Sequence, residues 1–279
     1  MVIRDALVWG SNMLKQNGID SLDARILLKA VTGFDDIGLS VNSNMEVPSD
    51  INDKYVDMIN RRIKNEPVAY ITGTKEFMSL EFLIEPGILI PRPETEHIIE
   101  YVIDKNIKNA NVLDICTGSG AIAVSIASYL KDSTVTAIDI SDKCIEVATK
   151  NAHKNNVSDR CKILKGDALK KLDFETQFDI VISNPPYIKS KDIFNLEKDV
   201  NEYEPHLALD GGDDGLMFYR IISKNAYDVL KCGGIIIYEI GFDQAQDVCD
   251  ILKDKYTDIK VIKDFAGLDR IVTATKTNN

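Results

Sequence analysis

The sequence is poor in the residues that build metal centres and disulfide frameworks. Its 279 residues include five cysteines and three histidines, and no two cysteines form a CxxC pair. An odd number of scattered cysteines is typical of buried, reduced thiols and argues against both disulfides and a zinc site. The histidines show no metal-ligand spacing. We therefore expect no metal.

Long apolar runs and an excess of positive charge are also missing. No apolar run approaches the ~20 residues that cross a bilayer, and the first residues lack the basic start and apolar stretch of a signal peptide. These absences predict a cytoplasmic protein that does not bind membranes. The formal net charge of −11 would repel a phosphate backbone, so we expect no direct nucleic-acid binding and favour protein or small-molecule substrates. Alternatively, the acidity only aids solubility.

What is present suits an ordinary globular protein with two domains. Hydrophobic residues make up 44% and charged residues 28% of the chain, enough to bury a sizeable core. Helical periodicity predicts helices over residues 5–16, from Ser21 to a stop at Gly33, and from an N-cap at Ser49 to Pro67. This bundle, set at residues 1–74, contains no nucleophile-and-base grouping. A substrate-recognition domain is therefore favoured over a structural cap.

The pattern changes to alternation at Phe77 and then to a strand and helix rhythm. Leu80, Phe82 and Ile84 share one face before a Pro86-Gly87 turn, which predicts a hairpin linker over residues 75–93. Residues 94–279 predict an α/β domain with a Rossmann-like, mostly parallel, doubly wound sheet. Expected strands cover 112–114, 134–139, 162–164, 178–183 and 234–238, followed by an antiparallel pair at 260–263 and 270–274.

A glycine-rich segment marks a candidate cofactor site. Gly118 and Gly120 follow the first strand of this sheet, where the backbone must turn tightly against a ligand. Asp139 ends the second strand, 21 residues after Gly118, where a carboxylate can accept both hydrogen bonds of a ribose diol. Alternatively, the glycines make only a tight turn and Asp139 caps the next helix.

Acidic residues favour an adenosyl sulfonium over a dinucleotide at this site. Asp114, on the strand before the loop, would repel a diphosphate but would stabilise the ammonium of methionine, directly or through water. Asp167 follows the third strand, where it can accept from an adenine amino group or serve as a solvated turn residue. We therefore expect S-adenosylmethionine as cofactor and S-adenosylhomocysteine as product.

The fourth strand ends directly in Asn184-Pro185-Pro186-Tyr187. Because the carboxyl ends of parallel strands face the ligand crevice, Asn184 would lie beside the transferable group. An amide nitrogen is a poor nucleophile and must be positioned; the Asn184 side-chain oxygen and the Pro185 carbonyl can hold both hydrogens of a planar NH₂. Tyr187 would form an apolar wall. The same geometry serves glutamine, adenine N6 or cytosine N4, and a merely rigid loop is the alternative.

Several segments together resemble the release factor glutamine methyltransferase family (PrmC/HemK type) over almost the whole chain. Asn-Pro-Pro-Tyr also occurs in DNA adenine methyltransferases, but the proline-bracketed Arg92 segment and the Glu-Pro to Gly-Gly stretch are similar to the glutamine enzymes. The segments that carry the resemblance are Ile90–Glu96, Asp114–Ala123, Asn184–Tyr187, Tyr203–Pro205 and Leu209–Leu216.

The resemblance implies an N-terminal helical domain that helps grip a release factor, a hairpin linker and a class I methyltransferase domain. We expect a monomer, although the sequence does not decide the oligomeric state. Its implied target is the side-chain amide nitrogen (N5) of the glutamine in a Gly-Gly-Gln loop; which release factor is modified stays open. Matching positions imply cofactor contacts by Asp114, Cys116, Thr117, Gly118, Ser119, Gly120, Asp139, Asp167, Ala168 and Asn184, catalysis by Asn184, Pro185 and Tyr187, and a substrate side that adds Pro186, with Arg92 and Glu204 supporting the active-site loops.

Two residues depart from the family pattern, and three rival functions remain. Cys116 stands where glycine is common, and Ala168 stands where a bulky residue often lies beside the adenine, so cofactor binding is expected to be weaker. A DNA or RNA amino-methyltransferase would need a basic groove and a target-recognition insert, which the acidic chain lacks. A noncatalytic translation-factor adaptor is encouraged only by Cys116. A dehydrogenase ranks third because no hydride-transfer or acid-base grouping is evident.

Overall fold

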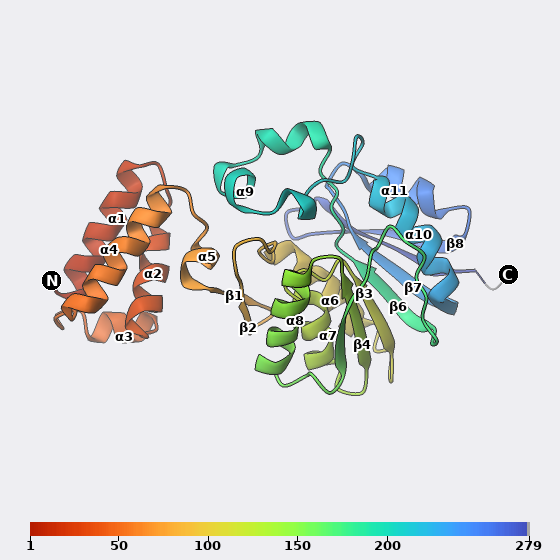
Figure 1. Ribbon diagram of the computed structural model, residues 1–279, viewed down its shortest axis with the longest axis horizontal. Helices are drawn as coiled ribbons and strands as arrows, with labels where there is room; N and C mark the ends of the chain where they lie inside the picture. The colour runs from red at the N-terminus through yellow and green to blue at the C-terminus, as the bar shows by residue number, and fades with distance from the viewer. Residues whose placement is uncertain (278–279) are drawn as a thin grey trace. The chain divides into compact units, whose positions relative to one another are not determined.

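The computed structural model describes residues 1–277, which fold as two compact units (Figure 1). The first unit comprises Met1–Thr74 together with Glu197–Tyr203. The second comprises Lys75–Leu196 and the chain that follows Tyr203. The polypeptide therefore leaves the second unit, contributes one short helix to the first, and returns.

The first unit is a helical bundle. Its helices are α1 (Ile3–Gln16), α2 (Leu22–Thr32), α3 (Asp36–Val41), α4 (Ser49–Ile63), α5 (Val68–Thr72) and the inserted α9 (Lys198–Tyr203). Tyr55 fills the centre: its hydroxyl donates to the Ala24 carbonyl at 3.0 Å, and a Cβ at Gly10 would lie only 2.2 Å from that hydroxyl. Gly33 ends α2 with a left-handed φ of 71°, as expected. Ser49, however, is already helical, and Pro48 occupies the N-cap.

Helix α9 joins the first unit through specific contacts. The Tyr203 hydroxyl donates to the Lys64 carbonyl at 2.8 Å. The Arg62 guanidinium lies 2.7 Å from an Asp23 carboxylate oxygen and 4.0 Å from one of Asp199. Because Arg62 and Lys64 lie at the end of α4, the residues just before Glu204 are held by the helical bundle.

The linker contains a hairpin, but not at the expected turn. Strands β1 (Thr74–Phe77) and β2 (Leu80–Leu83) are joined at Met78 and Ser79, both with positive φ. The expected Pro86-Gly87 turn is present, with the Ile88 amide donating to the Glu85 carbonyl at 3.2 Å, but it does not join the strands of the hairpin, because the residues after it find other partners. Ile88 packs against Cys144 and Val147, and the Ile90 amide donates to Glu204 at 3.0 Å rather than to a strand.

The second unit contains a seven-stranded sheet in the order β5-β4-β3-β6-β7-β9-β8 (Figure 1). All neighbouring strands are parallel except the pairs β7-β9 and β9-β8. The strands are β3 (Asn111–Ile115), β4 (Thr134–Asp139), β5 (Cys161–Lys165), β6 (Phe178–Ser183), β7 (Leu230–Glu239), β8 (Tyr256–Lys263) and β9 (Asp269–Lys276). The prediction of a doubly wound, mostly parallel sheet is confirmed.

Helices cover both faces of this sheet. Helices α7 and α8 pack on β3, β4 and β5, whereas α10 and α11 pack on β7, β8 and β9. The helices of this unit are α6 (Glu96–Asp104), α7 (Ala121–Tyr129), α8 (Asp142–Lys154), α10 (Met217–Val229) and α11 (Ala245–Leu252), with 3-10 turns η1 (Pro93–Thr95), η2 (Ser190–Asn195) and η3 (His206–Ala208). The buried side of α10, including Tyr219 and Ile222, completes the core.

The order of the strands in the sheet determines where a ligand site can form. From β3 the chain winds outward through β4 to β5, and then returns to form β6 on the other side of β3. Between the carboxyl ends of β3 and β6 the loops diverge, which opens a crevice for a ligand at this reversal. The glycine-rich loop and Asn184 lie at these two strand ends.

Candidate active site

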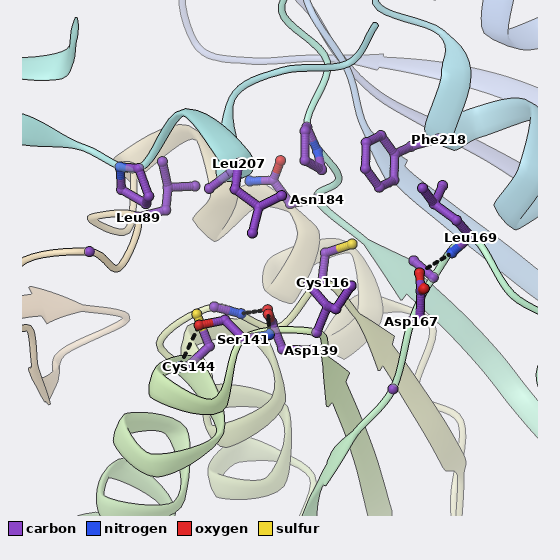
Figure 2. A pocket seen from close by; sticks show the side chains of 18 residues that line it. Leu89, Cys116, Asp139, Ser141, Cys144, Asp167, Leu169, Asn184, Leu207 and Phe218 are labelled. Atoms are coloured by element: carbon purple, nitrogen blue, oxygen red, sulfur yellow. Dashed lines mark hydrogen bonds between the residues drawn. The ribbon is translucent and has the colours of Figure 1, made fainter.

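A pocket opens at the carboxyl ends of β3, β4 and β6 (Figure 2). It receives residues from the linker, the glycine-rich loop, the loop after β5 and the loop after β6. Its lining residues are Gly87, Leu89, Cys116, Gly118, Asp139, Ile140, Ser141, Cys144, Gly166, Asp167, Ala168, Leu169, Asn184, Pro186, Pro205, Leu207, Ala208 and Phe218. The structure therefore brings Cys116, Gly118, Asp139, Asp167, Ala168, Asn184 and Pro186 of the expected site together in one cavity.

The loop after β3 is held in an unusual backbone conformation. Cys116, Gly118 and Gly120 all have positive φ, of 64°, 57° and 81°. Only glycine adopts this region without strain, so Cys116 is the one of the three with a steric cost. A Cβ at Gly118 would meet nothing within 4 Å, which leaves room for a ligand, whereas one at Gly120 would lie 3.0 Å from the Ala148 Cβ. Gly120 thus permits the close packing of α7 on α8.

Two carboxylates in the pocket are oriented by backbone amides. Asp139 accepts from the Gly118 amide at 2.9 Å and from the Ser141 amide at 3.0 Å, one bond to each oxygen (Figure 2). Asp167 accepts from the Leu169 amide at 2.9 Å. Since each carboxylate oxygen has two lone-pair sites, both groups retain acceptor capacity toward a ligand. Asp139 therefore braces the glycine loop and faces the cavity at the same time.

Asp114 lies below the pocket rather than in its wall. Its side chain is 0% exposed, one oxygen accepts from the Thr117 hydroxyl at 2.6 Å, and Oδ1 has no hydrogen-bond partner among the described residues. Burial raises the pKa of Asp114 to about 7, and the Thr117 hydrogen bond opposes that rise. Thr117, Ser119 and Gly120 are also outside the lining set, and they shape the loop from beneath.

Apolar side chains form the walls beside the two carboxylates. Ile140 and Leu169 directly follow the Asp139 and Asp167 regions and remain 48% and 39% exposed, with Phe218 of α10 nearby in the lining. Exposed apolar side chains at the rim of a cavity favour binding of a flat, apolar ring face. Leu169 and Phe218 therefore supply the apolar surface that Ala168 is too small to provide.

A buried polar chain lies behind Asn184. The Asn184 Nδ2 donates to the Thr95 hydroxyl oxygen at 3.3 Å, and the Thr95 hydroxyl donates to Glu239 Oε2 at 2.6 Å. Thr95 belongs to η1 and Glu239 ends β7, so three distant segments meet here. Burial raises the pKa of Glu239 to about 7, against the lowering effects of Thr95 and Arg270.

The loop after β6 is fixed by the glycine-rich stretch 209–216. Ile188 and Asp210 form an isolated parallel bridge, and the Gln244 side chain donates to the Tyr187 carbonyl at 3.0 Å. A Cβ at Gly211 would lie 2.7 Å from the Tyr187 Cα, and one at Gly215 would lie 2.4 Å from the Tyr187 oxygen. Both positions therefore need glycine. Tyr187 itself is not in the pocket lining, and burial raises the pKa of its hydroxyl.

Arg92 and Glu204 form an ion pair beside the pocket. Glu204 accepts from the Arg92 guanidinium at 2.5 Å and from the Ile90 amide at 3.0 Å, so both carboxylate oxygens are used. Pro205, next to Glu204, and Leu89, next to Ile90, both line the cavity. The pair thereby ties two walls of the pocket together, and neither side chain is itself in the lining.

Sequence reasoning missed several residues of this site. Thr95 and Glu239 were not singled out, although a glutamate that ends a buried strand at the carboxyl edge is a signal of the same kind as Asp139. Leu89 and Leu207 line the pocket because Glu204 holds the segment around Ile90 and because η3 carries Leu207. No motif at Leu89 or Leu207 predicts that these side chains line the pocket.

The lining residues fit an adenosyl sulfonium. The pocket's charged side chains are the two carboxylates of Asp139 and Asp167, and within residues 1–277 no lysine or arginine lines it. A diphosphate would be repelled here, whereas a cationic ligand would be stabilised. The open space beside Gly118 also leaves room for a ligand.

No grouping of three or more histidine, cysteine, aspartate or glutamate side chains in the described chain is arranged to hold a metal ion. None of the helices formed by residues 1–277 is long and apolar enough to cross a membrane.

The fold and the site together define a class I methyltransferase. A methyltransferase from Pyrococcus furiosus has the same fold, with a TM-score of 0.55 and 21% identity over 79% of this chain and 98% of that one. Family models match the chain at residues 5–73 (PrmC N-terminal domain) and 95–212 (methyltransferase small domain).

Full-length relatives show which family of methyltransferases the chain belongs to. The release factor glutamine methyltransferase of Clostridium acetobutylicum is 45% identical over 99% of both chains. That of Clostridium botulinum is 40% identical over 99% of this chain and 100% of its own. The chain belongs to the release factor glutamine methyltransferase family, as its motifs predicted.

Proposed function

We propose that this protein transfers a methyl group from S-adenosylmethionine to the side-chain amide nitrogen of a glutamine in a peptide chain release factor, at a Gly-Gly-Gln loop. The observation that carries the proposal is the placement of Asn184 in the lining of an acidic pocket, at the end of β6 beside the glycine-rich loop. When bound, S-adenosylmethionine supplies an electrophilic methyl group on a sulfonium ion.

The cofactor is held by groups of known orientation. Asp139, fixed by the Gly118 and Ser141 amides, accepts from the ribose hydroxyls. Asp167 accepts from the adenine amino group, and Ile140 and Leu169 cover the faces of the base. Asp114 lies beneath the loop and acts on the methionine ammonium through its field or through water rather than by direct contact.

The target amide is held by two acceptors. The Asn184 side-chain oxygen and the Pro185 carbonyl receive the two hydrogens of the glutamine NH₂ and present its nitrogen to the methyl group. Pro185 and Pro186 lack amide hydrogens and stiffen the loop. Leu89, Leu207 and Pro186 line the pocket and would shield the reacting amide from most of the solvent. As the bond from sulfur to the methyl group breaks and the bond from nitrogen to the methyl group forms, the nitrogen would release one proton to solvent and S-adenosylhomocysteine would leave.

The helical unit is the proposed contact for the body of the release factor. It carries exposed apolar side chains, with Ile37 72% and Val41 78% exposed on α3. The two residues are four positions apart and so lie on the same face of α3, and contiguous exposed apolar surface marks protein contacts. Replacement of both by aspartate should raise the KM for the release factor and leave the binding of S-adenosylhomocysteine unchanged.

Intact-mass analysis tests the proposal. Purified release factor and, separately, a short DNA duplex are incubated with this protein and S-adenosylmethionine, with Asn184→Ala as the control. A gain of one methyl group that maps to a glutamine and is lost in the variant supports the proposal. Methylated DNA would instead support a nucleic-acid amino-methyltransferase, and binding of the release factor without product would support an adaptor.

A further inference from the structure

The Asn184 amide must present its oxygen, not its nitrogen, to the substrate. Both ends of a carboxamide have similar size and shape, so packing alone does not choose between the two orientations. If the NH₂ end faced the pocket, two donors would oppose each other and the substrate amide would be repelled. Whatever decides the orientation of this amide therefore decides whether the site works.

The buried chain behind Asn184 supplies the required asymmetry. An ionised Glu239 is acceptor-only, so the single Thr95 hydroxyl proton is committed to Glu239 Oε2 at 2.6 Å. The Thr95 oxygen then offers only lone pairs to its other neighbour. Asn184 can satisfy it only with Nδ2, which lies at 3.3 Å. The carbonyl end of Asn184 is thereby left for the substrate.

We propose that Thr95 and Glu239 are positioning residues that fix the polarity of the Asn184 amide, so that its carbonyl oxygen accepts from the target glutamine. The inference rests on the proposed function for the identity of the substrate. It assigns a role to two side chains that lie outside the pocket lining, 4% and 1% exposed, and that come from η1 and β7. Neither reaches the reacting atoms.

The hydrogen bonds from Asn184 through Thr95 to Glu239 have a fixed donor-to-acceptor direction only while Glu239 is charged. A protonated Glu239 can donate to Thr95, which frees the Thr95 proton for the Asn184 oxygen and turns the NH₂ end toward the substrate. Arg270 of β9 favours the charged form of Glu239, Glu94 of η1 opposes it, and Tyr187 and Tyr219 lie in the same field. Because burial raises the pKa of Glu239 to about 7, the reversal falls within an accessible pH range.

Kinetics of the full chain on purified release factor test this role. Thr95→Val keeps the shape but removes the hydroxyl, and should lower kcat about 10- to 100-fold, with binding of S-adenosylhomocysteine unchanged by calorimetry. Thr95→Ser should restore most of kcat. The matched control is Thr273→Val, a buried threonine on β9 whose hydroxyl contacts only Tyr101 among the described side chains. Equal losses in both valine variants, or a kcat for Thr95→Val within twofold of the wild type, would overturn the proposal.

The pH profile separates positioning from packing. Wild-type kcat should rise about tenfold from pH 6 to a plateau above pH 8, as expected for one ionisation near pH 7. Glu239→Gln should lower the plateau value of kcat and remove the rise of kcat with pH, because the glutamine amide does not titrate. Thr273→Val, which leaves Thr95 and Glu239 in place, should keep the rise of kcat with pH. A rise of kcat with pH that persists in Glu239→Gln contradicts the proposal.

A second readout does not depend on the proposed substrate. The side-chain ¹⁵NH₂ resonances of Asn184, assigned by their loss in Asn184→Asp, should shift with a midpoint near pH 7 in the wild type and be pH-independent in Glu239→Gln. A wild-type signal that does not titrate would refute the polarity switch. If that signal titrates and release factor is not methylated, the proposed function fails and the positioning chain stands.

Discussion

The Glu204 carboxylate accepts a hydrogen bond of 2.5 Å from the Arg92 guanidinium, although 112 residues separate them. Glu204 is 1% exposed at its side chain and also accepts from the Ile90 amide. Glu204 directly follows α9 in the chain, and the next residue, Pro205, lines the pocket, so the ion pair lies beside the pocket wall. Four consequences of the structure can be measured.

Loss of the Glu204 charge should destabilise the protein. In Glu204→Gln the new NH₂ opposes either the Arg92 or the Ile90 donor, so a buried donor loses its partner at a cost of about 1–3 kcal/mol in the free energy of unfolding. Chemical denaturation gives the value. The control is Asp250→Asn, which breaks the exposed Lys253–Asp250 pair at 3.1 Å and should change stability by less than about 1 kcal/mol. Equal effects of the two substitutions would refute a special role for Glu204.

Cys116 should be a strained position that glycine relieves. Its φ of 64° disfavours any side chain with a Cβ. Cys116→Gly should therefore be about 1 kcal/mol more stable than Cys116→Ala, which removes the thiol but keeps the Cβ. Thermal unfolding of both variants makes the comparison, and an alanine variant as stable as the glycine variant would show that the backbone is not strained.

Gly215 should be required for the position of Tyr187. In Gly215→Ala the new methyl group would lie 2.4 Å from the Tyr187 oxygen, so the loop that carries Asn184 must shift. We expect methyl transfer to fall about 100-fold, since displacement of about 1 Å at a reacting group has effects of this size. Gly267→Ala is the matched control, because Gly267 has a φ of 81° and nothing within 4 Å of its Cβ position. Rates are measured with release factor under saturating cofactor.

The two buried acids should make the stability of the unliganded protein fall with rising pH. Burial raises the pKa values of Asp114 and Glu239 to about 7, from ordinary values of 3.8 and 4.5. The folded state holds these protons more tightly than the unfolded state, so this stabilisation is complete below about pH 4 and is lost as the pH rises through about 7.

Asp114→Asn isolates the contribution of Asp114 to this pH dependence of stability. The free energy of unfolding of the wild type minus that of the variant should fall by about 4 kcal/mol between pH 4 and pH 8, because the pKa of Asp114 rises from 3.8 to about 7, and should stay constant above that range. Urea denaturation at intervals of pH provides the curve. A difference that rises with pH would mean that Asp114 is stabilised as a carboxylate in the unliganded protein.

The strand and helix pattern was sufficient to predict the sheet, because each predicted strand is short, apolar and bounded by turns. Prediction failed where the tertiary environment decided the backbone. Met78 and Ser79 adopt positive φ at the hairpin turn, which neither residue type favours. Pro86 and Gly87 form a turn as predicted, but it leads into a segment held by Glu204 and not into a second strand of the hairpin. The long helix α10 was not predicted, although its buried face completes the core.

The sequence by itself determined the family and the chemistry, because the motifs at Gly118, Asp139 and Asn184 each follow a strand whose carboxyl end must face the crevice. Only the tertiary structure decided which neighbours make that chemistry selective. Thr95 and Glu239 are 144 residues apart, and their contact depends on η1 meeting the end of β7. Local propensity acts over one turn or one strand, whereas burial and hydrogen-bond partners come from whichever distant segments the core brings together.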